Sequence, residues 1–333
     1  MSKPLPILPQ MPWNVKQMIV NSANAMTKHQ LRFAAKEYKN LVTHSPVYYG
    51  GLDFVYENRH KECRITLDID KTRSLTVWFQ KIGTGYTVKK LLGREGTFKN
   101  GDFFEAIANH IARIFRNPKA HFGRFLIAID ASHSPTETYN EIKESIFKPL
   151  HLAILALGHL ISFRGLNLGL SPTNEELFNL LSYSQPGYFK YINVRSETNY
   201  MFALPESQRD LSRVVELEQW KQASELLGSD LTMRAPFQKW SHFTRIELYA
   251  PDLTFDEAKQ LIEIYINSSH FRHGRVRFQS EISHQLFDHF SSIGTQFRGT
   301  RIRLILRGPK YSLILTIDHT SQSFQFFTGS ANF

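Results

Sequence analysis

The sequence predicts an α+β protein with helices at the N-terminus, then an antiparallel β-meander, then a curved, solenoid-like α/β layer. Apolar residues recur at helical spacing before residue 46, and the period changes to two between residues 48 and 91. Between residues 120 and 280, strand-like apolar runs alternate with helical stretches. Such alternation is typical of parallel strands joined by helical crossovers.

The first segment, residues 1–46, is predicted to form a separate basic unit of two helices. Six lysines and arginines against Glu37 alone give it five of the ten surplus positive charges of the chain. The first helix is expected to begin near Pro12, and the second to be capped by Thr27. Two helices this short cannot bury their apolar stripes on each other alone, so surplus apolar surface should face another domain or a partner.

The remaining residues, 47–333, are expected to form one larger domain. A β-meander is predicted at 48–91, an α/β repeat region at 101–280 and a C-terminal meander at 298–328. Within the repeat region, strands are predicted at 122–129, 160–168, 188–194, 231–234, 244–249 and 276–278. Helices are predicted at 102–116, 137–149, 173–183, 210–227 and 254–268, with a further one near 281–292.

The strand and helix at 244–262 resemble one degenerate leucine-rich repeat, although the period along the chain is irregular. This resemblance implies a short curved solenoid whose parallel strands are exposed on a concave face.

The composition is that of a folded protein of a reducing compartment. Of the 333 residues, 42% are hydrophobic and 21% are charged, which excludes disorder along the whole chain. Cys63 is the only cysteine, so an internal disulfide and a zinc site built on cysteine pairs are excluded. Because no stretch is apolar enough for a signal peptide or a membrane span, we expect a cytoplasmic protein, with the nucleus as the alternative.

No motif in the sequence supports catalysis, a cofactor or a metal. The glycines at 83–85 and 93–96 lack the pattern of a phosphate-binding loop, and no G-x-S-x-G nucleophile motif is present. His284 and His289 are five residues apart, which does not place both on one helical face. We therefore expect no catalytic, cofactor-binding or metal-binding residues.

Nucleic-acid binding is a weaker possibility that rests on the arginines of the last strands. Arg301 and Arg303 would share one face of a strand while Ile302 and Leu304 share the other. Ordinary polar-out alternation explains this pattern, so no nucleic acid is expected as a partner.

Two stretches near the N-terminus carry a family resemblance. Residues 8–19 read LPQMPWNVKQMI and residues 31–42 read LRFAAKEYKNLV. Together they resemble an F-box, although Ala34 and Ala35 replace the usual Val-Cys pair. The resemblance implies that a Skp-family adaptor binds this segment through Met11, Pro12, Val15, Met18, Ile19, Leu31, Ala35 and Tyr38.

A second stretch, VVELEQWKQA at residues 214–223, resembles the signature of the FTH domain, a module that follows F-boxes in a family greatly expanded in nematodes. The segments GDFFEAI at 101–107, WSHF at 240–243 and LTFDEA at 253–258 occur in the order expected of that domain. The signature is also predicted to be an amphipathic helix with Val214, Leu217, Trp220 and Leu227 on its core stripe.

The two resemblances imply the substrate-recognition subunit of an SCF-type ubiquitin ligase, which is not itself an enzyme. It would bind a Skp-family adaptor, and through it a cullin, with the F-box, and an unidentified target protein with the FTH domain. One alternative is a protein that sequesters or neutralises one partner outside a ligase. A nucleic-acid-binding protein is the second alternative, and a hydrolase would need a site that the sequence does not provide.

The target is expected to meet the polar face of the parallel strands, because side chains two apart on neighbouring strands project together. The residues predicted to contact it are Arg164, Tyr191, Arg245 and Arg275. Their charge favours a target with an acidic surface.

Overall fold

The structure is a computed structural model, and it divides into two compact units. The first unit comprises Met1–Arg164 with Tyr183–Tyr188, and the second comprises Gly165–Ser182 with Phe189–Phe333. The residues described are 11–24, 27–28, 30–31, 41, 45–70, 72–90, 96–98, 101–130, 136–170, 172–194, 210–232, 237–250, 253–277, 285–286, 288–289, 296–298, 301–307, 312–318 and 323–329.

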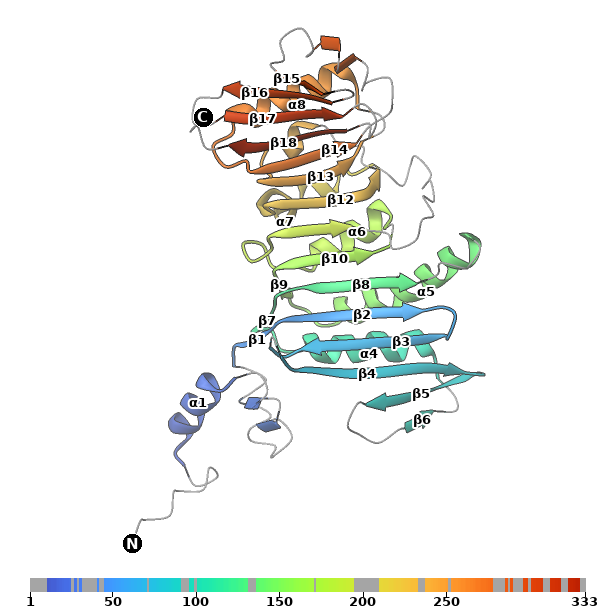
Figure 1. Cartoon of the computed structure of the whole chain (residues 1–333). Helices are drawn as coiled ribbons and strands as arrows, with labels where there is room; N and C mark the ends of the chain where they lie inside the picture. Colours follow the sequence, from blue (N-terminus) through green and yellow to red (C-terminus); the bar gives the residue numbers. More distant parts are fainter. Residues whose placement is uncertain are drawn as a thin grey trace. The chain divides into compact units, whose positions relative to one another are not determined.

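The first unit contains the predicted meander (Figure 1). Neighbouring strands pair antiparallel in chain order, and β8 (Phe125–Asp130) lies parallel to β2 at one side. The meander strands are β2 (Gly51–Glu57), β3 (Glu62–Asp68), β4 (Ser74–Ile82), β5 (Gly85–Lys90) and β6 (Gly96–Phe98). A small parallel sheet contains β1 (Val47–Tyr49), β7 (Ala120–Phe122) and β9 (Ser162–Phe163) in that order. Tyr48 therefore belongs to this parallel sheet and not to the meander, because its strand pairs with β7.

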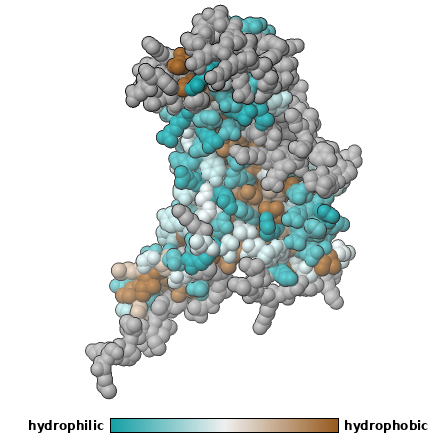
Figure 2. All heavy atoms as spheres, in the orientation of Figure 1, coloured by the Kyte–Doolittle hydropathy of each residue, from teal (hydrophilic) through white to brown (hydrophobic). Residues whose placement is uncertain are grey.

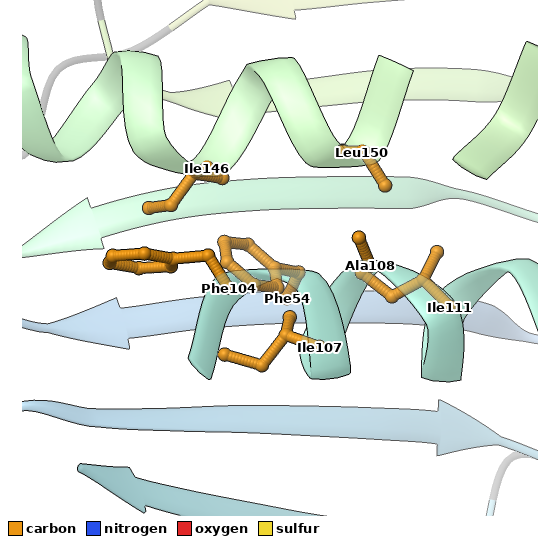
Figure 3. Close-up of a pocket in the computed structure, with 7 residues that line it drawn as sticks. All are labelled: Phe54, Phe104, Ile107, Ala108, Ile111, Ile146 and Leu150. Carbon is orange, nitrogen blue, oxygen red and sulfur yellow. The ribbon is translucent and has the colours of Figure 1, made fainter. Parts of the chain in front are cut away.

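Two helices pack against the meander on the side away from the viewer in Figure 1. The predicted helix at 102–116 is α4 (Phe103–Phe115), and the side chain of Asp102 caps it by accepting from the Glu105 N–H at 2.7 Å. The core between α4, α5 (Thr136–Leu155) and β2 is apolar and almost filled, leaving a cavity of about 10 Å³ (Figure 3). Such a void is too small and too apolar to hold a ligand.

Helix α5 is longer than predicted because it continues through a proline. The sequence prediction ended this helix at residue 149, where Pro149 removes one backbone donor. The helix nevertheless runs on to Leu155, and Leu150 and Ile154 are buried beyond the proline. Burial of these side chains offsets the lost backbone hydrogen bond.

The second unit contains the predicted parallel strands. β10 (Gly165–Gly169), β11 (Tyr191–Val194), β12 (Glu225–Thr232), β13 (Arg245–Tyr249) and β14 (His273–Arg277) pair in parallel, in chain order. The predicted C-terminal meander follows antiparallel, with β18 (Ser323–Gly329) beside β14, then β17 (Ser312–Asp318), β16 (Arg301–Arg307) and β15 (Gln296–Arg298). Helices α6 (Asn174–Ser182) and α8 (Phe255–Asn267) lie on the far side of these strands in Figure 1.

Two of the sequence motifs contact each other in the core of the second unit. Trp220 is fully buried, and its indole Nε1 donates to the carbonyl of Lys239 at 3.2 Å. His242 Nε2 donates to the Trp220 carbonyl at 2.9 Å, and the rings of Trp220 and Phe243 meet edge to face at 5.3 Å. The stretch at 214–223 and the stretch at 240–243 therefore hold each other in place.

The long helix predicted at 210–227 is wrong. The chain forms a short 3₁₀ turn, η3 (Val214–Glu216), and a five-residue helix, α7 (Glu218–Gln222), and then enters β12 at Glu225. Leu226 is buried, whereas Leu227, predicted for the core stripe, lies half-buried on the other face of the strand. The strand predicted at 231–234 accordingly begins six residues earlier, because pairing with β11 and β13 outweighs the helical spacing of the apolar residues.

The fold is thus a mixed α/β structure without a closed barrel among the described residues. The leucine-rich-repeat character of the parallel strands stays a prediction. Most of the helix predicted near 281–292 lies outside the described residues. No helix in the described part of the chain has the length and apolar character needed to cross a membrane.

Candidate functional site

The first candidate surface is the outer face of α1 (Trp13–Ser22), which we define as Val15, Met18 and Ile19, and exposed Trp13 lies in the first turn of the same helix. Trp13 is 57% exposed and Met18 is 69% exposed, while Val15 and Ile19 are half-buried. Figure 2 shows hydrophobic residues gathered over this helix. An apolar helix face of this kind is a typical site for a protein partner.

The opposite face of α1 packs inside the first unit. Val20 is fully buried against Leu41, and Leu31 packs partly buried on the same cluster. Lys28 is also buried, and its Nζ donates to the carbonyls of Asn21, at 3.3 Å, and Pro46. Burial lowers the pKa of this amine. Lys28 thus ties the end of α1 to the segment that enters β1.

Of the residues predicted to bind an adaptor, some are exposed in the structure and others pack in the interior of the first unit. Pro12 and Met18 are exposed, while Val15 and Ile19 on α1, and Met11 just before it, are half-buried. Leu31 instead packs inward on Val20 and Leu41, while Ala35 and Tyr38 lie outside the described residues. The sequence prediction did not include Trp13, which is exposed in the first turn of α1.

The cap predicted at Thr27 lies at Asn24. The Asn24 side chain accepts from the Thr27 N–H at 2.9 Å, and its carbonyl accepts from the Lys28 N–H at 3.0 Å. Asparagine has the same capping chemistry as threonine, so composition alone does not choose between them.

The second candidate surface is the outer strand face of the second unit. One row across the parallel strands contains Tyr191, Glu225, Arg245 and His273 in register, and the next contains Asn193, Leu227, Glu247 and Arg275. The alternating residues of these strands, such as Ile192, Leu226 and Ile246, are fully buried on the helix side. Figure 2 shows mainly hydrophilic residues over β13 and β14 on this face.

The charges on the outer strand face are partly paired. Arg245 Nη2 lies 2.7 Å from Glu247 Oε1, and His273 Nε2 lies 4.0 Å from the same oxygen. Burial lowers the pKa of His273; Glu247 acts against that shift, and Arg245 and Arg275 add to it. Burial therefore favours the neutral form of this imidazole, and exposed Arg275 is the stronger cationic feature.

The Tyr191 side chain packs on other residues of the second unit. Its ring covers Gly165 so closely that a Cβ at that glycine would lie 2.0 Å from it. Asn193 Nδ2 donates to Asn167 Oδ1 at 2.9 Å, and Asn167 Nδ2 reaches the Tyr191 hydroxyl at 3.5 Å. Tyr191 thus helps to order the asparagines, and any contact with a target would use only its exposed edge.

Arg164, the fourth residue predicted to contact the target, belongs to the first unit. It is exposed at the bend after β9, and its backbone N–H donates to the carbonyl of Phe122 at 2.8 Å. The residues that the sequence prediction missed on the outer strand face are Glu225, Leu227 and His273. Glu225 and Leu227 were missed because both fell within the helix that was wrongly predicted at 210–227.

The described residues also line two open grooves. One, of about 610 Å³, lies beside Arg124, whose guanidinium donates to both oxygens of Asp53, at 2.8 and 2.7 Å, and to Asp68 at 2.9 Å. The other, of about 660 Å³, lies along the C-terminal half of α8 and is lined mainly by neutral polar groups. The described residues contain no group of three histidine, cysteine, aspartate or glutamate side chains placed for a metal ion.

Comparison with known proteins finds one match. Residues 153–292 match the FTH domain, so the chain contains an FTH domain over that range. The match begins inside α5 and includes η3, α7, β13, α8 and β14. No curated protein matches this chain, and no solved structure matches it.

Proposed function

We propose that this chain is the substrate-recognition subunit of an SCF-type ubiquitin ligase. In this proposal, residues 1–46 act as an F-box that binds a Skp-family adaptor, and the FTH domain binds the target. One observation carries the proposal: an FTH domain occurs in the same chain as an N-terminal helix with one buried and one exposed apolar face. Burial of each outer aliphatic residue would contribute about 1.5–3 kcal/mol.

Charge supports the proposed adaptor contact. Residues 1–46 carry five surplus positive charges, which favours an acidic partner. Such charges raise the rate of association more than the final affinity. Apolar contact through the outer face of α1 would then supply most of the binding free energy.

In the proposed function the chain performs no chemistry. It would hold a target close to a ubiquitin carrier that the cullin brings, which raises the effective concentration of the target lysines. The cytoplasm or nucleus would be the compartment in which such a complex acts.

The proposal is tested by changing the outer face of α1. Val15→Asp with Ile19→Asp should abolish binding to a purified Skp-family adaptor, because each change places an unpaired carboxylate in an apolar contact. Met18→Asp should weaken binding on its own, and the exposure of Met18 means that little folded-state packing is lost. A matched control is Asn14→Asp with Asn21→Asp, which adds the same charge at exposed polar positions of the same helix.

Adaptor binding is measured by isothermal titration calorimetry, and circular dichroism verifies that each variant is folded. Equal binding by Met18→Asp and by the double apolar variant would contradict the F-box assignment. So would a wild-type chain that binds no adaptor. Co-purification of a cullin from native extract separates a ligase subunit from a protein that only sequesters its partner.

A further inference from the structure

An aromatic cluster lies on one face of the small parallel sheet of the first unit. Tyr48 on β1 and His121 on β7 are register partners, so their side chains share that face. Their rings stack at 4.9 Å with an interplanar angle of 15°, and the ring of Tyr188 lies 5.0 Å from that of His121. We call Tyr48, His121 and Tyr188, together with Arg164, the aromatic platform.

The platform is directed outward by strand alternation. Val47 and Ala120 are buried register partners, and Tyr49 stacks on buried Phe122 at 5.2 Å on the inner face. Tyr48, between Val47 and Tyr49, is 66% exposed. Tyr48 therefore projects away from the core of the first unit.

Within the described residues, the stack ends at Tyr48. Strand β1 is at the edge of its sheet, with β7 as its only neighbour among the described strands. The ring of Tyr48 rests on His121 with one face, and no other ring of the described residues stacks on its second face. Stacking on an aromatic ring stabilises a contact beyond the effect of the buried area alone.

Cationic groups border the platform. Arg164 is exposed and close enough to Tyr188 to affect the pKa of its hydroxyl, which burial and Tyr48 raise and Arg164 lowers. Lys119 is also exposed, and its carbonyl accepts from the Val47 N–H at 3.2 Å, which places it beside β1. Among the described residues, no group hydrogen-bonds to His121 Nδ1, which is buried.

We propose that the aromatic platform binds an acidic segment of a partner protein. One planar side chain of that segment, aromatic or prolyl, stacks on the second face of Tyr48, and its carboxylates pair with Arg164 and Lys119. Tyrosine and arginine are the residue types that contribute most at protein interfaces. The inference does not depend on adaptor binding, because the platform residues lie outside the proposed F-box.

A protein segment fits the geometry better than a single-stranded nucleic acid. The platform rings contact each other at 4.9 and 5.0 Å, so no base can enter between them. Single-stranded nucleic acids are usually bound by several rings that each stack on a separate base. The platform offers the second face of Tyr48, which matches one anchoring side chain.

The test is a fluorescence anisotropy titration of the full chain with three labelled probes at low ionic strength. The first is the peptide Gly-Glu-Glu-Pro-Trp-Pro-Glu-Glu-Gly, the second has lysine for every glutamate, and the third is a twelve-nucleotide oligouridine. We expect only the acidic peptide to bind. Tyr48→Ala and Arg164→Glu should each weaken its binding by about tenfold, whereas Tyr48→Phe, which keeps the ring, should change it less than about threefold.

Several results would overturn the proposal. These are the absence of acidic-peptide binding, equal binding of the acidic and basic peptides, or unchanged binding by Arg164→Glu, whose exposed side chain can be changed without loss of the fold. Oligouridine binding that is lost in Tyr48→Ala, without acidic-peptide binding, would assign the platform to nucleic acid instead. Melting temperatures of all variants verify that they are folded.

Discussion

Arg245 and Glu247 form an ion pair along one strand of the outer strand face, with 2.7 Å between Nη2 and Oε1. Residues two apart on a strand share a face, so their side chains reach each other without any contribution from a neighbouring strand. The pair lowers the net positive charge that this face presents. Arg275, on the adjacent strand and in register with Glu247, would consequently be the better anchor for the proposed acidic target.

Because of this ion pair, charge reversal at Arg245 and at Arg275 should reduce target capture to different extents. Arg275→Glu should reduce target capture by about tenfold, because it replaces an attraction with a repulsion at the interface. Arg245→Glu should reduce it less, since Glu247 already offsets that charge. Quantitative mass spectrometry of co-purified proteins compares the variants, with Arg59→Glu in an exposed turn as the matched control. Equal capture by Arg275→Glu and wild type would place the target elsewhere.

Tyr265→Phe should destabilise the second unit by about 1–3 kcal/mol. The Tyr265 hydroxyl is buried and donates to the Trp240 carbonyl at 2.7 Å, so its removal leaves a buried acceptor without that donor. The free energy of unfolding from urea titration measures the loss. Tyr249→Phe, at a half-buried outer position, should cost less than about 0.5 kcal/mol. Similar values for both variants would contradict the assigned role of the hydrogen bond.

Pro149→Ala should stabilise the first unit by about 1–3 kcal/mol. The proline interrupts the backbone hydrogen bonding of α5, and alanine restores the missing N–H in a helix that is otherwise continuous to Leu155. Differential scanning calorimetry should show a higher melting temperature. A lower one would mean that packing of the proline ring contributes more than the restored hydrogen bond.

Stability should fall as the pH decreases from 7 to 5, in part through His242. Burial lowers the pKa of this imidazole in the folded state, despite the hydrogen bond from its Nε2 to the Trp220 carbonyl. The unfolded chain therefore binds a proton near its ordinary pKa of about 6.5, while the folded chain binds it only at lower pH. The stabilisation is complete above the unfolded pKa and is lost as the pH falls through the folded pKa. His242→Gln should flatten the dependence of unfolding free energy on pH, and an unchanged slope would contradict this role.

Much of the secondary structure followed from local periodicity. The meander, α4 and β13 were predictable because each has one buried face, and the buried face imposes a period of two or 3.6 on the apolar residues. The cap of α4 at Asp102 was equally local, since a capping side chain bonds to a backbone group three residues away. The helix was wrongly predicted at 210–227 because Leu227 lies seven residues, about two helical turns, after Trp220, a spacing that also fits a helix.

The candidate surfaces depended more strongly on tertiary structure. By itself the sequence determined the basic N-terminal segment, the apolar stripe of the first helix and the alternation of strands with helices, because these are properties of neighbouring residues. Only the tertiary structure decided that Leu31 packs inward, that Arg245 is paired, and that Tyr48, His121 and Tyr188 meet on one face. These relationships join residues from separate strands and helices, and their distances depend on strand register and packing, which no local pattern encodes.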